Sequence, residues 1–475
     1  MTIGAKKIAT NAFLLSLSSG INLAISVVTT SLIARSFGPE LYGTYTFGLA
    51  YIMVFTVLAN FGIESLFVRE AAREPEHIKR LISNVVHLKI ILAIGTVVIV
   101  DVSANLLGYP DRTVKVIYVL SIGLFFQIMS TTLMAVYRSQ ERMAVIAVFN
   151  VVFRVVTAVL ILASIYFGIG LKGVVAAYTV GCFVVFVGNA IVFRRDYGRI
   201  GWKLDPSAWK DLIYRGRAFY VSALFGTIYL RINLFVLSKS VNELELGYFM
   251  AAWTLVETLY VFPEAVTGAL FPAFSRIYGT AEEALGMVYS KMLKYILILS
   301  VAVCAGCLVV GDEILLLIYG PKFHDSIPIL NVLIFLWAVG FLSNMMGWLL
   351  YAIKKETTHV KVMGAGCVVS LVLSIAFIEW FGTVGSAYAL ILSETFLVVS
   401  MAVVLHRSGL RSNLDGRLLR LALVVPAMVF AVRLMLDFNV VIQVMVGALV
   451  YAVSIYLFRV LDREELIALR RMIRR

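Results

Sequence analysis

The chain has 475 residues, of which 61% are hydrophobic and 15% are charged. Soluble domains are typically about 45–50% apolar and about 25% charged, so this composition excludes an ordinary set of globular domains and favours a membrane protein. The formal net charge is +13. Such a charge would suggest nucleic acid in a soluble protein, but in a membrane protein basic residues mark the cytoplasmic loops. We therefore expect no nucleic-acid partner.

Fourteen apolar segments follow one another along the chain. Each is about 20 residues or longer, which is enough to cross a hydrocarbon core about 30 Å thick. They cover residues 10–34, 42–67, 81–104, 113–137, 143–167, 173–193, 217–238, 246–271, 287–310, 328–352, 358–380, 384–405, 417–436 and 440–459. The first has no clear cleavage site, so we interpret it as an uncleaved span. The pattern predicts an all-α polytopic membrane protein with about 14 transmembrane helices.

Lys and Arg are distributed unevenly between the predicted loops. If the N-terminus is cytoplasmic, most of the 41 basic residues fall in the inner loops and the two tails. The outer loops hold only Arg35, Arg112, Lys115, Lys172, Lys239, Lys322 and Arg433. Because Lys and Arg are retained on the cytoplasmic side of short loops, we expect a multi-pass protein of the cell membrane with both termini cytoplasmic.

The chain contains an internal repeat. Residues 106–110 (LLGYP) recur as 316–321 (LLIYGP), and 167–178 recur as 381–389, both at an offset of about 210 residues. Gly43 and Gly247 begin a third, weaker match. Three matches in order predict two six-helix lobes followed by two additional helices. Each lobe has an even number of spans, so the lobes are parallel and the substrate site is expected between them near the midplane.

These features divide the chain into four parts. We predict an N-terminal six-helix lobe over residues 1–193, a cytoplasmic lobe linker over 194–216 and a C-terminal six-helix lobe over 217–406. Residues 407–475 hold the two extra helices and a basic amphipathic tail. Aromatic side chains at predicted span ends, such as Tyr42, Tyr45 and Tyr109, are interpreted as interfacial anchors.

Three basic residues lie inside predicted spans: Lys89 in the third, Arg154 in the fifth and Arg231 in the seventh. A charge at the bilayer centre costs at least about 2.5–3.5 kcal/mol, so such residues are candidates for function. The arginines are deep, whereas the long stem of Lys89 could reach the inner headgroups. A guanidinium can hold phosphate oxygens in pairs, so these residues are candidates for binding a diphosphate and glycan in a cavity. The alternative is structural pairing with Glu257 or Glu394.

Three acids also lie within spans. Glu257 and Glu264 are seven residues apart in the eighth span, which predicts one helix face, and Glu394 lies near the middle of the twelfth. Buried carboxylates could carry protons or bind sodium during alternating access, or they could pair with Arg231. Pro263 removes a backbone hydrogen bond and could act as a hinge or form a static kink.

The cysteines and histidines give no sign of a metal site. Cys182, Cys304, Cys307 and Cys367 all lie in apolar spans, and the five His residues are scattered. Cys304 and Cys307 form a C-x-x-C pair without a neighbouring His or acid, so we interpret them as small packing residues. We predict no cofactor apart from possible proton or sodium coupling.

Residues 34–45 (ARSFGPELYGTY) resemble the turn after the first helix of polysaccharide and O-antigen flippases. Similar stretches follow at 60–63, 69–72, 247–252, 270–276, 318–323 and 382–387. The resemblance implies the fold of the multidrug, oligosaccharidyl-lipid and polysaccharide exporter superfamily. It also implies movement of a polyprenyl-diphosphate-linked oligosaccharide from the inner to the outer leaflet, for cell-surface polysaccharide or glycan synthesis. The expected partners are this lipid-linked substrate, membrane lipids and other glycan-assembly membrane proteins. One departure is Arg231, near which the family often carries an acid.

Three other functions stay open. A cation-coupled multidrug exporter of the same fold would favour a cavity of net negative charge, whereas Arg154 and Arg231 favour a polyanionic head. A membrane glycosyltransferase or ligase would need a large aqueous loop with acids or His, but the longest loop has only about 23 residues and no D-x-D sequence. A non-transporting scaffold is the third. We therefore predict a transporter and not an enzyme.

Overall fold

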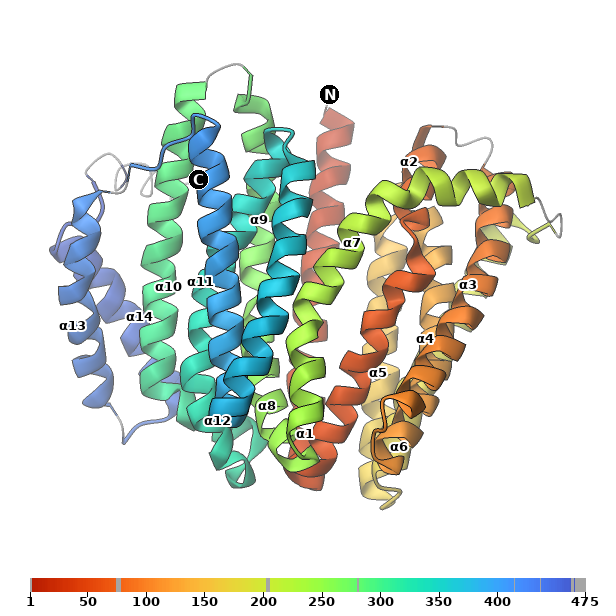
Figure 1. The fold of residues 1–475 in the computed structure, drawn as a ribbon, viewed down its shortest axis with the longest axis horizontal. Helices are drawn as coiled ribbons and strands as arrows, with labels where there is room; N and C mark the ends of the chain where they lie inside the picture. Colours follow the sequence, from red (N-terminus) through yellow and green to blue (C-terminus); the bar gives the residue numbers. More distant parts are fainter. Residues whose placement is uncertain are drawn as a thin grey trace. The chain divides into compact units, whose positions relative to one another are not determined.

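The computed structural model describes residues 2–73, 78–201, 206–279, 282–413, 415–435, 437–462 and 465. Over these residues the chain forms α-helices and short 3₁₀ helices, without a strand (Figure 1). It folds into two compact units. Unit 1 comprises Met1–Ser238 and Asn242–Met250, and unit 2 comprises Lys239–Val241 and Ala251–Arg475. The lobe boundaries expected from the sequence repeat stay a prediction.

Unit 1 is built around helix α4. Its helices are α1 (Thr2–Asn60), α2 (Ile63–Arg73), α3 (Ile78–Leu106), α4 (Asp111–Ser139), α5 (Met143–Tyr166), α6 (Leu171–Tyr197) and most of α7 (Pro206–Ser240). Helix α4 packs against α1, α2, α3, α5 and α6. This position explains why more than half of the residues in its most apolar window are buried.

Unit 2 is built around helix α11. Its elements are the C-terminal part of α8 (Glu243–Leu259), α9 (Val261–Ile277), α10 (Glu282–Tyr319), η2 (Pro321–Ser326), α11 (Ile327–Ala352), α12 (Glu356–Arg407), η3 (Gly416–Arg420), α13 (Leu421–Arg433) and α14 (Val440–Leu457). Helix α11 packs against α9, α10 and α12, while α13 and α14 pack on each other and on α10. The predicted amphipathic tail lies almost entirely outside the described residues.

Two long helices contain a sharp break that separates consecutive predicted spans. Helix α1 breaks at Gly38, where φ is 75°, and α12 breaks at Gly382, where φ is 60°. Glycine adopts positive φ without steric penalty, and Pro39 removes the next backbone donor in α1. Each of these helices therefore holds two of the predicted membrane crossings.

Nine helices in the described part of the chain are long and apolar enough to cross a membrane. The seventh predicted span lies in α7 and the eighth in α8 and α9. The thirteenth lies in η3 and α13; at 1.5 Å per residue, the 13 residues of α13 reach only about 20 Å, so the crossing needs η3 as well. The prediction of an all-α polytopic membrane protein is confirmed.

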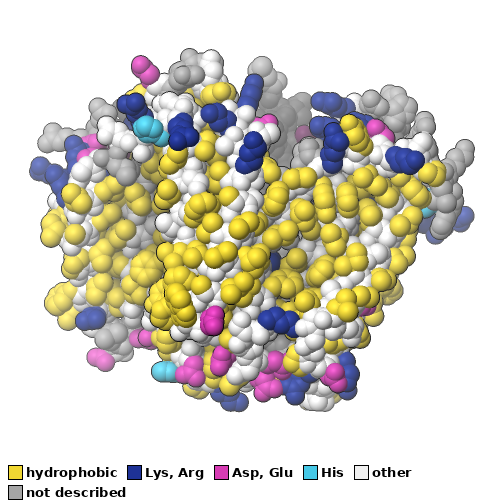
Figure 2. Space-filling model, viewed as in Figure 1, with side chains coloured by type: hydrophobic (Ala, Val, Ile, Leu, Met, Phe, Trp, Pro, Cys, Tyr) yellow, Lys and Arg dark blue, Asp and Glu magenta, His cyan; other side chains and the backbone are white. Residues whose placement is uncertain are grey.

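Side-chain types are sorted along the helices. On the face drawn in Figure 2, hydrophobic side chains cover the middle of both units, most Lys and Arg lie toward the upper ends, and most Asp and Glu lie toward the lower ends. Large apolar side chains are exposed in both units, for example Val159 on α5 and Leu449 on α14. Apolar exposure of this extent suits contact with lipid and not with water.

Helix α7 begins earlier than the sequence suggests. Pro206 stands at its start, inside the predicted linker, and Leu212 is buried among residues of α2 and α3. Figure 1 shows the first part of α7 lying across the ends of α2 and α3 before the helix turns. Arg215 pairs with Glu70, and a Cβ atom at Gly216 would lie 2.5 Å from the Phe61 carbonyl oxygen. The second half of the linker is therefore part of unit 1.

The interpretation of three tyrosines as interfacial anchors is wrong. Tyr42, Tyr45 and Tyr109 are 1%, 6% and 8% exposed. Tyr109 packs against Tyr51, and its hydroxyl shares a 3.1 Å hydrogen bond with that of Ser238 near the end of α7. Tyr42 and Tyr45 follow the break in α1, and Tyr109 directly precedes α4, the central helix of unit 1, so all three rings are buried in the unit.

Candidate functional site

Arg154 is an intramembrane cation on helix α5. It stands near the centre of the helix, about 17 Å from either end at 1.5 Å per residue. The side chain is exposed on unit 1, and its guanidinium carbon lies 5.9 Å from the centroid of the Phe153 ring. Its other interactions are electrostatic, with Tyr45 of α1 and Tyr178 of α6. Within the described part of unit 1, no carboxylate pairs with Arg154.

The residues around Arg154 form what we call the arginine cluster: Tyr45, Gln127, Arg154 and Tyr178. The Tyr178 hydroxyl donates a 2.9 Å hydrogen bond to Gln127 Oε1 on α4. Gly123, also on α4, leaves room for the ring, since a Cβ atom there would lie 2.9 Å from Tyr178 Cε1. The packing of α4 against α6 thus fixes one side of the site.

Lys89 belongs to a different network. Its side chain is buried and donates a 3.0 Å hydrogen bond to Asn60 Oδ1 at the end of α1. Glu64 on α2 is its electrostatic partner and also forms a 2.8 Å ion pair with Arg138. The ammonium group therefore lies inside unit 1 and does not reach the headgroups, which is a correction to the sequence interpretation.

Arg231 lies on α7 and is partly buried, close to the almost fully buried Asn233. The interactions of Arg154 do not include Arg231. A common role for the two arginines stays a prediction.

Two of the three predicted acids lie near Tyr260 in unit 2. Glu394 is buried, whereas Glu257 is exposed and accepts a 3.2 Å hydrogen bond from Trp253 Nε1. Tyr260 lies within electrostatic range of both Glu394 on α12 and Glu257 on α8. Its hydroxyl donates a 2.9 Å hydrogen bond to the Leu336 carbonyl of α11, and Ser343 Oγ donates to Glu394 Oε1. We call Glu257, Tyr260, Ser343 and Glu394 the acidic cluster. Gly340 of α11 makes it possible, because a Cβ atom there would collide with the Tyr260 hydroxyl.

Pro263 and Glu264 lie just beyond this cluster. Helix α8 ends at Leu259 and α9 begins at Val261, since Pro263 has no N–H to donate to the Leu259 carbonyl. Tyr260 between them keeps helical φ and ψ of −66° and −17°, so Glu257 and Glu264 lie on either side of a one-residue interruption and their common face stays a prediction. Glu264 is exposed and has no side-chain interaction among the described residues. The break agrees with the position of Pro263, while its movement as a hinge stays a prediction.

The polar partners of these charges were not among the residues predicted from the sequence. Tyr178, Gln127, Tyr260 and Ser343 carry no charge, so hydropathy gives no reason to select them. A glycine on the facing helix, such as Gly123 or Gly340, indicates that a large side chain packs opposite it. This signal can be used only when the pairing of the helices is known.

Comparisons with known proteins agree with this architecture. The sequence pattern of the family described as "Polysaccharide biosynthesis protein" matches residues 8–278, more than half of the chain. The probable low-salt glycan biosynthesis flippase Agl15 of Haloferax volcanii is 21% identical over 432 residues, which cover 87% of each chain. The putative O-antigen transporter of Shigella flexneri is 20% identical over 379 residues, 76% of this chain and 89% of the relative.

Two solved structures share the fold. The lipid II flippase MurJ in its inward closed conformation superposes with a TM-score of 0.75 at 15% identity, covering 94% of this chain and 98% of that one. An inward-facing multidrug resistance MATE family transporter of the MOP superfamily gives 0.67 at 18% identity, covering 83% and 95%. At these identities the likeness establishes the fold alone. With the match over residues 8–278, the chain belongs to the polysaccharide biosynthesis protein family.

Proposed function

We propose that this protein is a flippase that moves a polyprenyl-diphosphate-linked oligosaccharide from the inner to the outer leaflet by alternating access. The observation that carries the proposal is Arg154, an exposed cation near the middle of α5 without a carboxylate partner in the described part of unit 1. Arginine stays charged in such surroundings, so the site has a positive charge to offer an anionic head.

The chemistry of the substrate fits this arrangement. A diphosphate carries negative charge, and a guanidinium can hold two of its oxygens at once. The oligosaccharide head needs a watery path, whereas the prenyl tail can stay in lipid. Arg154 is exposed on unit 1, as such a role requires. The relatives named as a glycan biosynthesis flippase and an O-antigen transporter support the same substrate class.

The acidic cluster suits the coupling step of this proposal. Glu394 is 9% exposed and accepts a hydrogen bond from Ser343, so it could take up a proton or a sodium ion as the transporter changes state. The cell membrane is the expected location, and the gathering of Lys and Arg at one end of the helices supports cytoplasmic termini. Glycan-assembly proteins of the same membrane are the expected protein partners.

A multidrug exporter of this fold is the competing function. The MATE structures share the architecture, and the acidic cluster would accept a cationic drug. Arg154 argues against it, since a cation in the pathway repels cationic drugs. For the enzyme alternative, the relatives are named for transport and not for catalysis.

The test is transbilayer movement of a fluorescent polyprenyl-diphosphate oligosaccharide in proteoliposomes. Losing one charge-assisted interaction of about 1.5–3 kcal/mol predicts a rate about 10- to 100-fold lower in Arg154→Gln. Arg194→Gln, which removes an exposed charge at the end of α6, is the matched control and should stay within about twofold. If wild-type protein moves no substrate under a proton or sodium gradient, the proposed function is wrong. If the wild type moves the substrate and Arg154→Gln moves it at the same rate, the flippase function is supported and the proposed role of Arg154 is wrong.

A further inference from the structure

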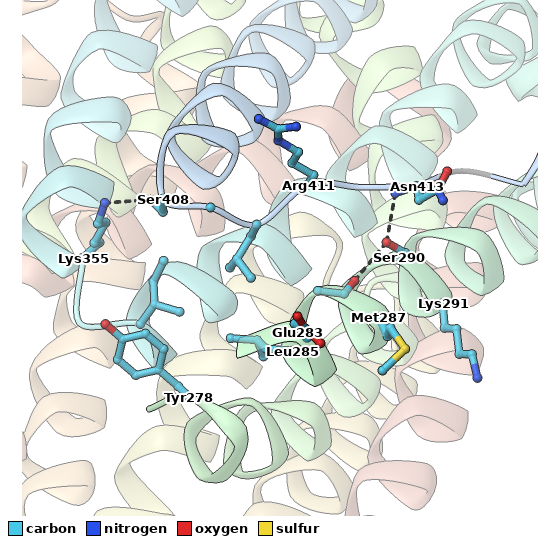
Figure 3. Close-up of a pocket in the computed structure, with 14 residues that line it drawn as sticks. Tyr278, Glu283, Leu285, Met287, Ser290, Lys291, Lys355, Ser408, Arg411 and Asn413 are labelled. Atoms are coloured by element: carbon cyan, nitrogen blue, oxygen red, sulfur yellow. Dashed lines mark hydrogen bonds between the residues drawn. The ribbon is translucent and has the colours of Figure 1, made fainter. Parts of the chain in front are cut away.

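A cavity of about 790 Å³ opens in unit 2 where three connections between helices meet (Figure 3). Its lining residues come from the end of α9 and the start of α10, from the α11–α12 connection, and from the segment after α12. The volume falls within the range of about 300–1,000 Å³ that is usual for small-molecule sites. All three connections follow even-numbered predicted spans and are expected to be cytoplasmic, so the cavity lies at the inner membrane surface in the proposed orientation.

The lining is positively charged. Lys291, Lys355 and Arg411 contribute three positive charges against the single acid Glu283. Among the described residues, none of the three basic side chains forms an ion pair. Lys355 Nζ donates a 2.7 Å hydrogen bond to Ser408 Oγ, whereas Lys291 and Arg411 are exposed and extend outward from opposite sides of the cavity in Figure 3. Two of the charges are therefore available to a ligand.

The remainder of the lining combines polar groups that are hydrogen-bonded within the protein with an apolar floor. Ser290 Oγ donates to the Gly286 carbonyl at 2.9 Å and accepts from the Asn413 N–H at 3.0 Å, which fixes the segment after α12 on α10. The floor is apolar, since Leu285, Ile353 and Leu410 line the cavity and are nearly buried. A charged rim over an apolar floor suits an amphipathic molecule with a phosphate head.

We propose that this cavity binds a phosphate group at the cytoplasmic membrane surface, supplied by the headgroup of an anionic phospholipid. Basic pockets between transmembrane helices on the cytoplasmic side are suited to such headgroups, because the leaflet concentrates them next to the site. The guanidinium of Arg411 can hold two phosphate oxygens, and the Lys291 ammonium can approach as a point charge. Free phosphate has the same chemistry and is distinguished by the experiment. The inference goes beyond the proposed function, since binding requires no transport.

The experiment measures the thermal unfolding midpoint of the full-length protein in an uncharged detergent. Phosphatidylglycerol, phosphatidylcholine with the same acyl chains, and inorganic phosphate are titrated separately. A ligand that binds only the folded state raises the midpoint, so we expect phosphatidylglycerol to raise it and phosphatidylcholine not to. An equal effect of inorganic phosphate would keep the phosphate site and assign it to a soluble ligand. No effect of either anion would overturn the proposal.

Three variants locate the effect in the cavity. Removing two charges in Lys291→Gln/Arg411→Gln should weaken phosphatidylglycerol binding about thirtyfold. Gly286→Leu should block the cavity while keeping every charge, since a Cβ atom there meets nothing within 4 Å and leucine favours a helix. Arg407→Gln/Lys354→Gln removes two exposed charges at the same end of unit 2, outside the lining, and should bind as wild type does. Equal losses in both double variants, or unchanged binding in Gly286→Leu, would contradict the site. Because the readout is stability, these outcomes are independent of the flippase assay.

Discussion

The two units carry polar clusters of opposite charge, each with a tyrosine that packs on a glycine of the central helix. In unit 1, Tyr178 stands beside Arg154 and packs against α4, where Gly123 makes room. In unit 2, Tyr260 stands beside two glutamates and packs against α11, where Gly340 makes room. Helices α4 and α11 contain the fourth and tenth predicted spans, which correspond in the sequence repeat. The same packing device therefore presents a cation in one half of the chain and acids in the other.

This difference indicates how one fold can serve two tasks. A cationic site attracts an anionic head, whereas a protected carboxylate can bind and release a proton or a sodium ion. The proposed function assigns the first task to unit 1 and the second to unit 2. Substitutions in one cluster should therefore change a different property of transport from substitutions in the other.

The largest effect that separates the units is expected from Glu394→Gln. Glutamine keeps an oxygen that accepts from Ser343 but cannot carry a charge or a proton at neutral pH. We expect the rate under an ion gradient to fall at least about tenfold, to the rate without a gradient. Arg154→Gln should lower the rate both with and without the gradient. Both rates are measured in the proteoliposome assay.

Glu379→Gln is the matched control, because Glu379 is an exposed acid on the same helix. It should keep the gradient dependence of the wild type. If Glu394→Gln transports at the wild-type rate under the gradient, the acidic cluster has no part in the coupling step. The arginine cluster and the acidic cluster would then resemble each other only in how their side chains pack.

An effect of intermediate size is expected from the two glycines. Gly340→Ala places a methyl group against the Tyr260 hydroxyl, and Gly123→Ala places one 2.9 Å from Tyr178 Cε1. Overpacking of this kind typically costs about 1–3 kcal/mol of unfolding free energy, with the larger loss for Gly340→Ala because its contact is closer. Thermal unfolding of the purified variants measures both losses.

A second substitution sharpens the glycine test. Tyr260→Phe removes the colliding oxygen but leaves the ring carbons Cε1 and Cζ 2.9 Å from the new methyl group, so it should restore only part of the stability of Gly340→Ala. Tyr178→Phe leaves the contacting ring carbon in place and should not rescue Gly123→Ala. Gly95→Ala and Gly306→Ala are controls in open space, one in each unit. If Tyr260→Phe does not rescue, the Tyr260 hydroxyl is not what Gly340 accommodates.

Much of the fold follows from local sequence. Span length predicts the membrane helices, and the breaks in α1 and α12 occur where glycine permits a positive φ. The start of α7 could not be predicted, because residues 206–216 are as polar as a loop and become ordered by packing on α2 and α3. Tyr45 was misread for a similar reason, since its distance from a span end says nothing about the helix it faces.

The site was predictable only in part. Because a charge within the membrane costs free energy, Arg154 and Glu394 can be chosen as candidate functional residues from the sequence alone. Which charges meet depends on helix pairing, and pairing placed Lys89 beside Asn60 and Glu394 beside Ser343. Neutral partners such as Gln127 and Ser343 carry no signal of their own. The sequence therefore identifies single charged residues, whereas the clusters that they form can be identified only from the structure.

The smallest effect is expected from Glu264→Gln. A spacing of seven residues predicts that Glu257 and Glu264 act together, but the break at Tyr260 leaves only Glu257 within range of the Tyr260 hydroxyl. Both acids are exposed, but among the described residues only Glu257 accepts a side-chain hydrogen bond, from Trp253 Nε1 at 3.2 Å, so the loss of Glu264 should change gradient-driven transport by less than about twofold. Glu257→Gln, measured in parallel, should weaken the gradient dependence. If the two variants behave alike, Glu257 and Glu264 act together in coupling, as their spacing predicts, and the acidic cluster does not determine which acid takes part. If they differ, the break that Pro263 imposes decides which acid takes part.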